Sequence, residues 1–167
     1  MIRPAKKTEI DEILQLTAAC AKHLISKGIY QWNEHYPSRT AFESDWADQS
    51  LYILKPEDTL VGTVVLSDHR DAEYDPINWL TPLQSHCLYV HRLAVHPNFQ
   101  GQGYAQQLMD FAEHKAKTEG YVSVRLDTFS QNSRNVKFYE QRGYTRLDDV
   151  YFPKQSEFPF HCYELVF

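Results

Sequence analysis

The segment from His91 to Met109 constrains this chain most, because it combines a strand, a glycine-containing turn and an amphipathic helix. Its sequence reads HRLAVHPNFQGQGYAQQLM. Gly101 and Gly103 let the backbone bend and let a ligand approach the main chain closely. The first turn of the following helix leaves N–H groups unpaired at the positive end of the helix dipole. The segment therefore predicts a site that binds a phosphate group beside a strand.

Length and composition predict one globular domain over residues 1–167. A chain of 167 residues is long enough to bury roughly two-thirds of its unfolded surface. Its content of 43% hydrophobic and 14% aromatic residues favours a packed core over disorder. The net charge of −5 and the absence of a basic run argue against nucleic acid as a partner.

Apolar patterning and cysteine usage predict a cytoplasmic protein with no membrane partner. No run approaches the roughly eighteen apolar residues that a membrane span needs, and the N-terminus shows no apolar signal segment. Cys20, Cys87 and Cys162 are few, odd in number and widely spaced. Such cysteines are typical of reduced compartments, and we expect no disulfide framework.

Hydrophobic periodicity predicts a mixed α/β sandwich. We expect helices from Thr8 to about Gly28 and from Thr40 to about Gln49, each starting at a capping-box-like spacing. Further helices are expected at 104–119 and 132–142. Strands are expected at 1–4, 51–54, 60–66, 86–95, 121–127, 144–152 and 160–167, and the last two should form an antiparallel pair.

Two familiar phosphate-binding turns do not fit the glycine turn. In a Rossmann turn the first glycine leaves its strand directly, whereas five residues separate Val95 from Gly101 here. Gln106 also occupies the position of the third glycine. No Gly-Lys-Ser/Thr follows, which excludes a Walker A loop.

Two blocks of sequence resemble the GNAT superfamily of acyl-CoA-dependent N-acyltransferases. The family's pyrophosphate motif, Gln/Arg-x-x-Gly-x-Gly/Ala, is met by Gln100, Gly103 and Ala105. The block NSRNVKFYEQRGY at 132–144 is similar to the family's Asn-x-x-Ala-x-x-Phe-Tyr-Glu-x-x-Gly-Phe segment. It departs by carrying Asn135 in place of alanine. The element order is family-like along the whole chain.

The resemblance implies a GNAT-like mixed, mostly antiparallel sheet with a central splayed strand pair and helices on both faces. It implies acetyl-CoA as cosubstrate, with its pantetheine arm along the strand end and its pyrophosphate in the turn. The cofactor-binding residues would be Leu93, Ala94, Val95, Gln100, Gly101, Gln102, Gly103, Tyr104, Ala105, Gln106, Asn132 and Asn135.

Tyr139 matches the family tyrosine that lies near the departing sulfur. A tyrosine has a higher pKa than a thiol, so we expect a strong hydrogen bond to the developing thiolate at least as much as full protonation. The strand 86–95 contains no acidic residue, so the sequence does not single out one general base for the acceptor. Tyr89 and His91 share a strand face, and His91 has the more suitable pKa for accepting the ammonium proton. Cys87 has no evident activating base, so we expect direct transfer in a ternary complex.

The sequence predicts no metal site. His86, His91 and His96 are five residues apart, which corresponds to roughly 16 Å along a strand with a change of face at each step. Three imidazoles placed in this way cannot meet on one ion.

The resemblance implies that the loop 31–37, between the first two helices, and the last hairpin, at 153–160, flank the acceptor. Trp32, Tyr36 and Trp79 would wall this site, and Glu34 would meet an ammonium group. We expect an N-acetyltransferase acting on a small primary amine. The alternatives are acetylation of a protein N-terminus or lysine, and a non-catalytic acyl-CoA-binding module. A homodimer remains open.

Overall fold

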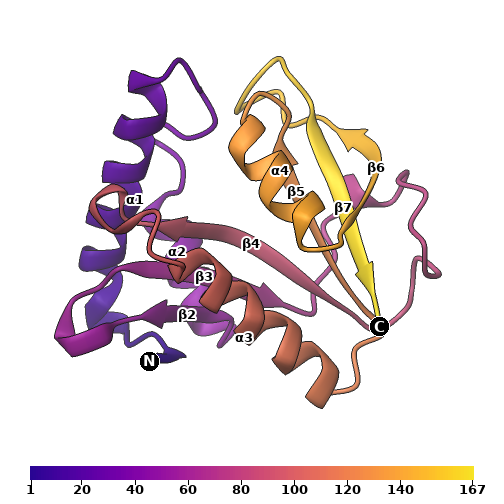
Figure 1. The fold of residues 1–167 in the computed structure, drawn as a ribbon, viewed down its shortest axis with the longest axis horizontal. Helices are drawn as coiled ribbons and strands as arrows, with labels where there is room; N and C mark the ends of the chain where they lie inside the picture. Colours follow the sequence, from indigo (N-terminus) through magenta and orange to yellow (C-terminus); the bar gives the residue numbers. More distant parts are fainter. The chain divides into compact units, whose positions relative to one another are not determined.

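The computed structural model describes all residues from Met1 to Phe167. Seven strands form one sheet in the order β1-β2-β3-β4-β5-β7-β6 (Figure 1). The strands β4 and β5 pair in parallel, and the pairs β1–β2, β2–β3, β5–β7 and β6–β7 are antiparallel. These findings confirm the mixed, mostly antiparallel α/β fold. The strands are β1 (Ile2–Pro4), β2 (Leu51–Leu54), β3 (Gly62–Ser67), β4 (Cys87–Val95), β5 (Ser123–Phe129), β6 (Thr145–Val150) and β7 (Phe160–Val166), and the helices are α1 (Ile10–Ser26), α2 (Arg39–Ala47), α3 (Tyr104–Thr118) and α4 (Ser133–Gln141).

The chain forms two compact units. The first contains residues 1–66 and 91–112, and the second contains residues 67–90 and 113–167. The chain passes from one unit to the other three times, at the end of β3, inside β4 and inside α3. The expectation that both units make a single domain stays a prediction.

In the first unit, helices cover both faces of the sheet. Leu51 and Ile53 of β2 point to one face, where they join a core cluster with residues of α1 and α2. Tyr52 points to the other face and packs its ring 5.2 Å from that of Phe111 in α3. The period-two alternation of β2 therefore separates the two helix layers. Besides the two β2 residues, this core cluster contains Ala5, Ile10, Ile13, Phe42 and Val65.

The helix termini differ from the expected ones in detail. A 3-10 turn at Lys7–Glu9 precedes α1, and the Lys6 amide donates to the Glu9 carboxylate at 2.8 Å. The capping box therefore lies two residues before the expected Thr8. Ser38, not Thr40, caps α2, because its hydroxyl accepts from the Ala41 amide at 3.1 Å.

In the second unit, α4 packs on β5 and closes over a group of aromatic side chains. The ring of Tyr139 lies 5.8 Å from that of Tyr144 in a T-shaped contact and 6.1 Å from that of Tyr163. The β5–β7 register places Arg125 directly opposite Glu164. The edge pair β6–β7 confirms the expected final hairpin.

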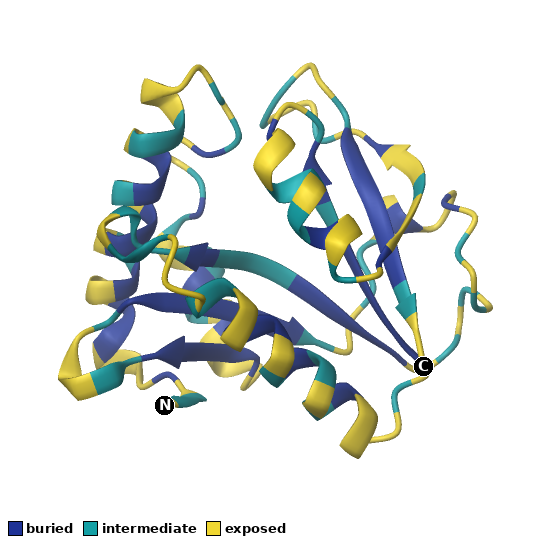
Figure 2. Cartoon of the chain, viewed as in Figure 1, coloured by how far each residue is buried: buried dark blue, intermediate teal, exposed yellow.

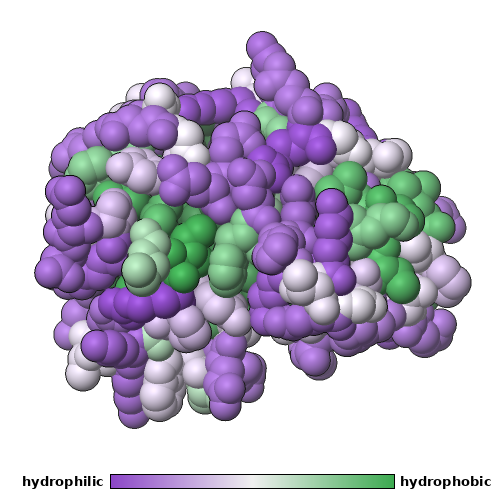
Figure 3. Space-filling model, turned by 60° about the horizontal axis from the view of Figure 1, so that its bottom comes forward, coloured by the Kyte–Doolittle hydropathy of each residue, from purple (hydrophilic) through white to green (hydrophobic).

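The strands β2, β3, β5 and β7 are mostly buried, whereas the edge strand β6 is mostly exposed (Figure 2). Along β4 burial changes at His91, because Cys87–Val90 are buried whereas His91, Arg92 and Leu93 are half-buried. Hydrophilic side chains dominate the face drawn in Figure 3, and apolar ones reach it in separate patches. None of the helices combines the length and apolar character that crossing a membrane requires.

Glu9 should make the stability of the first unit depend on pH. Hydrogen bonds from Arg3, opposed by burial, lower the pKa of Glu9 from 4.5 to about 2. A depressed pKa contributes stability that is present above pH 4.5 and lost as the pH falls toward 2. Glu9→Gln should therefore lower the free energy of unfolding by about 1–2 kcal/mol at pH 7, and by less at pH 3, in urea titrations. Glu12→Gln is the control, because the Glu12 side chain is 50% exposed. An equal loss at both pH values would contradict this prediction.

Candidate active site

The glycine turn before α3 has open space beside both of its glycines. Gly101 and Gly103 adopt positive φ angles of 78° and 84°, and a Cβ at either position would meet no atom within 4 Å. Glycine is therefore required here by the left-handed backbone conformation and not by a lack of space for a side chain. The backbone bond from the Gln107 amide to the Gly103 carbonyl, at 3.1 Å, begins the α3 ladder. The amides of Tyr104 and Ala105 precede this ladder at the positive end of the helix, as an anion site requires.

The strand end that leads into this turn is tied to α1 and to the turn itself. The Val95 carbonyl accepts from the Cys20 thiol at 3.3 Å and from the Gln100 side-chain amide at 3.3 Å. Gln100 therefore holds the turn against the end of β4, while Ala94 packs in the core. The carbonyl of Val95 is thus occupied within the chain, whereas Leu93 remains half-buried beside it.

Arg92 lies within β4 and forms hydrogen bonds with two other segments of the first unit. It has a positive φ of 50°. Its guanidinium donates to Asp45 from Nε at 2.9 Å and from Nη2 at 2.5 Å, and to the Tyr36 hydroxyl from Nη1 at 3.2 Å. This fork–fork ion pair is a geometry that strongly fixes both partners. Arg92 therefore positions Tyr36 in the loop after α1.

The other residues expected near an acceptor lie in different surroundings. Trp32 is 7% exposed and packs in a core cluster with Leu16, Cys20, Ala21 and Ala94. Glu34 is 85% exposed at its side chain. In the second unit, Trp79 donates from Nε1 to the Tyr74 carbonyl at 3.0 Å and stacks on the Arg125 guanidinium at 4.6 Å. The contacts of Trp32 and Trp79 give these side chains a packing role, and any contact they make with an acceptor stays a prediction.

Tyr139 combines burial with a hydroxyl that has no hydrogen-bond partner in the chain. Its side chain is 5% exposed and lies among the rings of Phe138, Tyr144 and Tyr163. Burial, with a smaller effect of the Asp127 charge, raises the pKa of Tyr139 well above its usual value. The hydroxyl therefore stays protonated at neutral pH and can donate a hydrogen bond. By contrast, Tyr144 and Tyr163 donate theirs to glutamates.

Asn132 caps α4. Its side-chain oxygen accepts from the Asn135 amide at 3.2 Å, and Asn132 is 4% exposed. This cap fixes the first turn of the helix that carries Tyr139. The asparagine at 135, where the family pattern has alanine, is half-buried.

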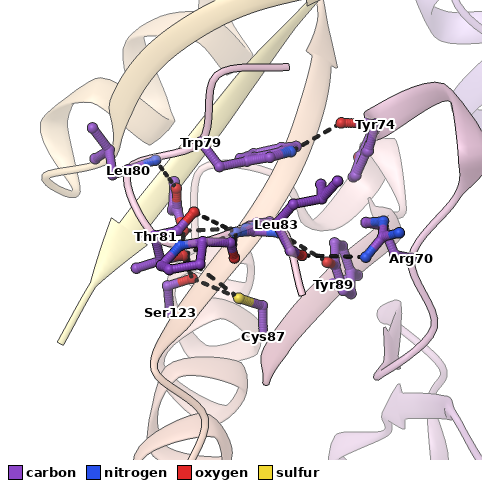
Figure 4. Close-up of polar contacts among 12 residues, drawn as sticks. Arg70, Tyr74, Trp79, Leu80, Thr81, Leu83, Cys87, Tyr89 and Ser123 are labelled. Carbon is purple, nitrogen blue, oxygen red and sulfur yellow. Dashed lines mark hydrogen bonds and ion pairs between the residues drawn. The ribbon is translucent and has the colours of Figure 1, made fainter. Parts of the chain in front are cut away.

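Tyr89 belongs to a buried polar network that the sequence did not reveal (Figure 4). Arg125 is fully buried and donates to the Tyr89 hydroxyl at 3.1 Å and to Glu164 at 3.2 Å. Burial raises the pKa of Tyr89, and the nearby Arg125 charge opposes this shift. Tyr89 is therefore suited to donate a proton in a hydrogen bond rather than to lose it.

Sequence reasoning also missed Asp45, Arg92 and Asp127. The Asp127 carboxylate accepts from the Tyr74 hydroxyl and acts electrostatically on Tyr139. The one signal for the buried Arg125–Glu164 pair is that β5 carries an arginine and β7 a glutamate. Opposite charges in neighbouring strands favour such a pairing, but register decides whether they meet.

Known proteins share both the sequence pattern and the fold. A family model described as "Acetyltransferase (GNAT) family" matches residues 10–144. The uncharacterized N-acetyltransferase YesJ of Bacillus subtilis is 24% identical over 143 residues, which cover 84% of this chain and 79% of that protein. A GNAT-family acetyltransferase of Streptococcus agalactiae has a similar fold, with a TM-score of 0.81, 23% identity, and coverage of 100% of this chain and 95% of the other. The yncA protein of Salmonella typhimurium, solved with its cofactor acetyl-CoA, gives a TM-score of 0.70 at 16% identity, with coverage of 99% of this chain and 92% of the other.

Proposed function

The chain belongs to the GNAT family of acetyltransferases, and we propose that it transfers an acetyl group from acetyl-CoA to a primary amine of a small molecule. Acetyl-CoA-dependent N-acetylation is the activity of the family. The acceptor class, the residue roles and the direct attack in a ternary complex are the parts that we propose here.

We assign the pyrophosphate of acetyl-CoA to the turn at 100–106. The left-handed glycines and the amides at the start of α3 support this assignment, because they offer donors and a positive helix end to a doubly charged group. Gln102 and Gln106 are exposed on the same turn. The net charge of −5 means that this local geometry, not the global field, attracts the polyanion.

The observation that carries the proposal is Tyr139, a buried residue whose hydroxyl makes no hydrogen bond within the chain. When the amine attacks the thioester carbonyl, the carbonyl oxygen gains negative charge, and collapse of this intermediate expels the thiolate of CoA. A protonated tyrosine near the sulfur stabilises the developing thiolate with a hydrogen bond and can deliver its proton. Tyr139 donates to no group of the chain, so its hydrogen remains for this purpose.

We assign to His91 the role of general base, which removes the proton of the acceptor ammonium directly or through water. His91 is half-buried on β4, one residue before the left-handed Arg92. Tyr89, the other candidate, has a raised pKa and accepts from a guanidinium. We therefore assign to Tyr89 the orientation of the acceptor rather than removal of its proton.

The surroundings of Cys20 and Cys162 make both poor nucleophiles for an acyl-enzyme, which supports direct transfer. All three cysteines of the chain are buried. Burial raises the pKa of Cys20 to about 12 and that of Cys162 still further, which leaves almost no thiolate at neutral pH.

The test is the release of CoA thiol from acetyl-CoA across a panel of small amines, peptides with free N-termini and lysine peptides. We expect turnover with small amines. Turnover with peptides alone would establish the protein acetyltransferase instead. Tight binding of acetyl-CoA in a calorimetric titration, without any acceptor, would indicate a non-catalytic module, and no binding at all would overturn the proposal.

Gly103→Ala should weaken the binding of acetyl-CoA by about tenfold or more. An alanine at φ 84° costs about 1–2 kcal/mol, and the turn can relieve this strain only by moving its amides away from the pyrophosphate. Gly120→Ala is a matched control, because Gly120 also has a positive φ, of 79°, and open space around it. Calorimetric titration with acetyl-CoA should show the loss in the first variant, whereas thermal melts should show similar destabilisation in both. Equal affinities in the two variants would refute the assignment.

A further inference from the structure

A polar pocket of about 400 Å³ opens in the second unit, outside the turn and Tyr139 described above. Its volume suits a small metabolite. The segment after β3 and the start of β4 supply its lining, which consists of Asp68, His69, Arg70, Gln84, Ser85, His86, Cys87 and Tyr89.

A buried guanidinium holds one wall of this pocket in place. Arg125 donates to the Thr81 carbonyl at 3.1 Å, to the Pro82 carbonyl at 2.9 Å and to the Leu83 carbonyl at 3.2 Å. Three consecutive carbonyls are thus fixed just before the lining residue Gln84 (Figure 4). Arg125 therefore holds the backbone next to one side of the pocket in place.

Two hydrogen-bond donors of the pocket have capacity that the chain does not use. Arg70 donates from Nε to Asp75 at 2.8 Å and from Nη1 to the Leu83 carbonyl at 3.2 Å, while its Nη2 donates to no group of the chain. The Tyr89 hydroxyl accepts from Arg125, and its own proton is donated to no group of the chain. Tyr89 lines the pocket and is 2% exposed, so this proton is a buried donor in a residue of the lining. Figure 4 shows both side chains joined to the network around Leu83.

The pocket is connected to Tyr139 through side chains of the same unit. The ring of Tyr74 lies 5.8 Å from that of Tyr89, and the Tyr74 hydroxyl donates to Asp127. Asp127 in turn raises the pKa of Tyr139. Tyr74 therefore links the lining residue Tyr89 to Asp127, which acts electrostatically on Tyr139.

The charges around the pocket favour a ligand with one carboxylate over a ligand with two. Arg70 presents a guanidinium edge that Asp75 holds in a fixed orientation, and guanidinium with a hydroxyl donor matches the oxygens of a carboxylate. Asp68 lines the same pocket from an exposed position and repels a second negative group. The other titratable side chains of the lining are His69, His86 and Cys87. The His86 ring stacks on that of Tyr121, with 4.0 Å between the ring centroids.

We propose that this pocket binds the carboxylate of the acceptor through Arg70 and Tyr89, so that the acceptor is an amine with one carboxylate, as in a neutral amino acid. The identification of the ligand as the acceptor rests on the acetyl transfer proposed above. Binding of a carboxylate by the pocket can be measured separately from turnover.

The experiment compares N-acetylglycine with N-acetylglycinamide, two product-like probes that differ only in the carboxylate. Their affinities are measured by equilibrium titration of the full chain with CoA present, for the wild type, Arg70→Gln, Arg70→Lys and Arg146→Gln. Arg146 is an exposed arginine of β6 in the same unit and serves as the control. A parallel assay compares the KM of glycine and glycinamide as acceptors of acetyl groups.

We expect the wild type and Arg146→Gln to prefer the carboxylate probe by about tenfold. Arg70→Gln should abolish this preference, and Arg70→Lys should retain part of it, because the charge remains while the fork geometry is lost. Equal affinity of the wild type for both probes would overturn the carboxylate site, even if glycinamide is acetylated rapidly. Selective binding of N-acetylglycine without turnover of any amine would support the site and count against the proposed function instead.

Discussion

Replacing Tyr139 with phenylalanine should lower the kcat of acetyl transfer by about 10²- to 10³-fold while leaving the affinity for acetyl-CoA unchanged. The substitution removes one hydroxyl and keeps the ring that packs against Phe138, Tyr144 and Tyr163. Because this hydroxyl has no partner in the chain, its removal leaves no other buried group unsatisfied. The variant should therefore fold normally and lose mainly the stabilisation of the leaving thiolate.

A neighbouring tyrosine provides the control for this result. Tyr144→Phe also removes a hydroxyl from the same aromatic group, but that hydroxyl donates to Glu113 at 3.1 Å. We expect this variant to lose stability and to keep its kcat. Steady-state thiol release, calorimetric binding of acetyl-CoA and thermal melts of both variants separate the two effects. A kcat of Tyr139→Phe within a factor of three of the wild type would show that Tyr139 only packs.

Replacing Arg125 with methionine should destabilise the protein by about 3–5 kcal/mol, the cost of removing one partner of a buried ion pair. Both side chains of the Arg125–Glu164 pair are fully buried. Glu164 also accepts from Ser123 at 2.7 Å, from the Leu80 amide at 2.6 Å and from Thr81. Although burial acts to raise the pKa of Glu164, these hydrogen bonds hold it below its usual value, so the carboxylate is charged in the folded protein. Without Arg125 that charge has no cation.

Urea titrations and a double-mutant cycle test this expectation. Glu164→Gln removes the charge but keeps a side-chain oxygen for the donors around it, and the double variant should be less destabilised than the sum of the single variants. Arg39→Met is the control, because Arg39 pairs with Asp11 at the surface, where both side chains are more than half exposed. It should change the free energy of unfolding much less. A loss as small as that of Arg39→Met would show that Arg125 does not anchor the segment before Gln84.

Much of the fold could be predicted because it depends on local patterns. The short apolar run from Leu51 to Leu54 predicted a strand, and the apolar stripe of residues 104–119 predicted a helix that the structure places at Tyr104–Thr118. Helix starts were less predictable, since both Ser38 and Thr40 can cap a helix and only the bond to the Ala41 amide selects Ser38.

The sequence by itself determined the family, the strand–turn–helix with its left-handed glycines, and Tyr139 as the candidate acid. These features lie within short segments, where φ preferences, spacing and helical periodicity act between near neighbours. Only the tertiary structure decided that Arg125 meets Glu164 and Tyr89, that Arg92 meets Asp45 and Tyr36, and that Arg70 and Tyr89 line one pocket. The physical reason is register, because a shift of one residue between β5 and β7 would turn Arg125 or Glu164 to the opposite face of the sheet.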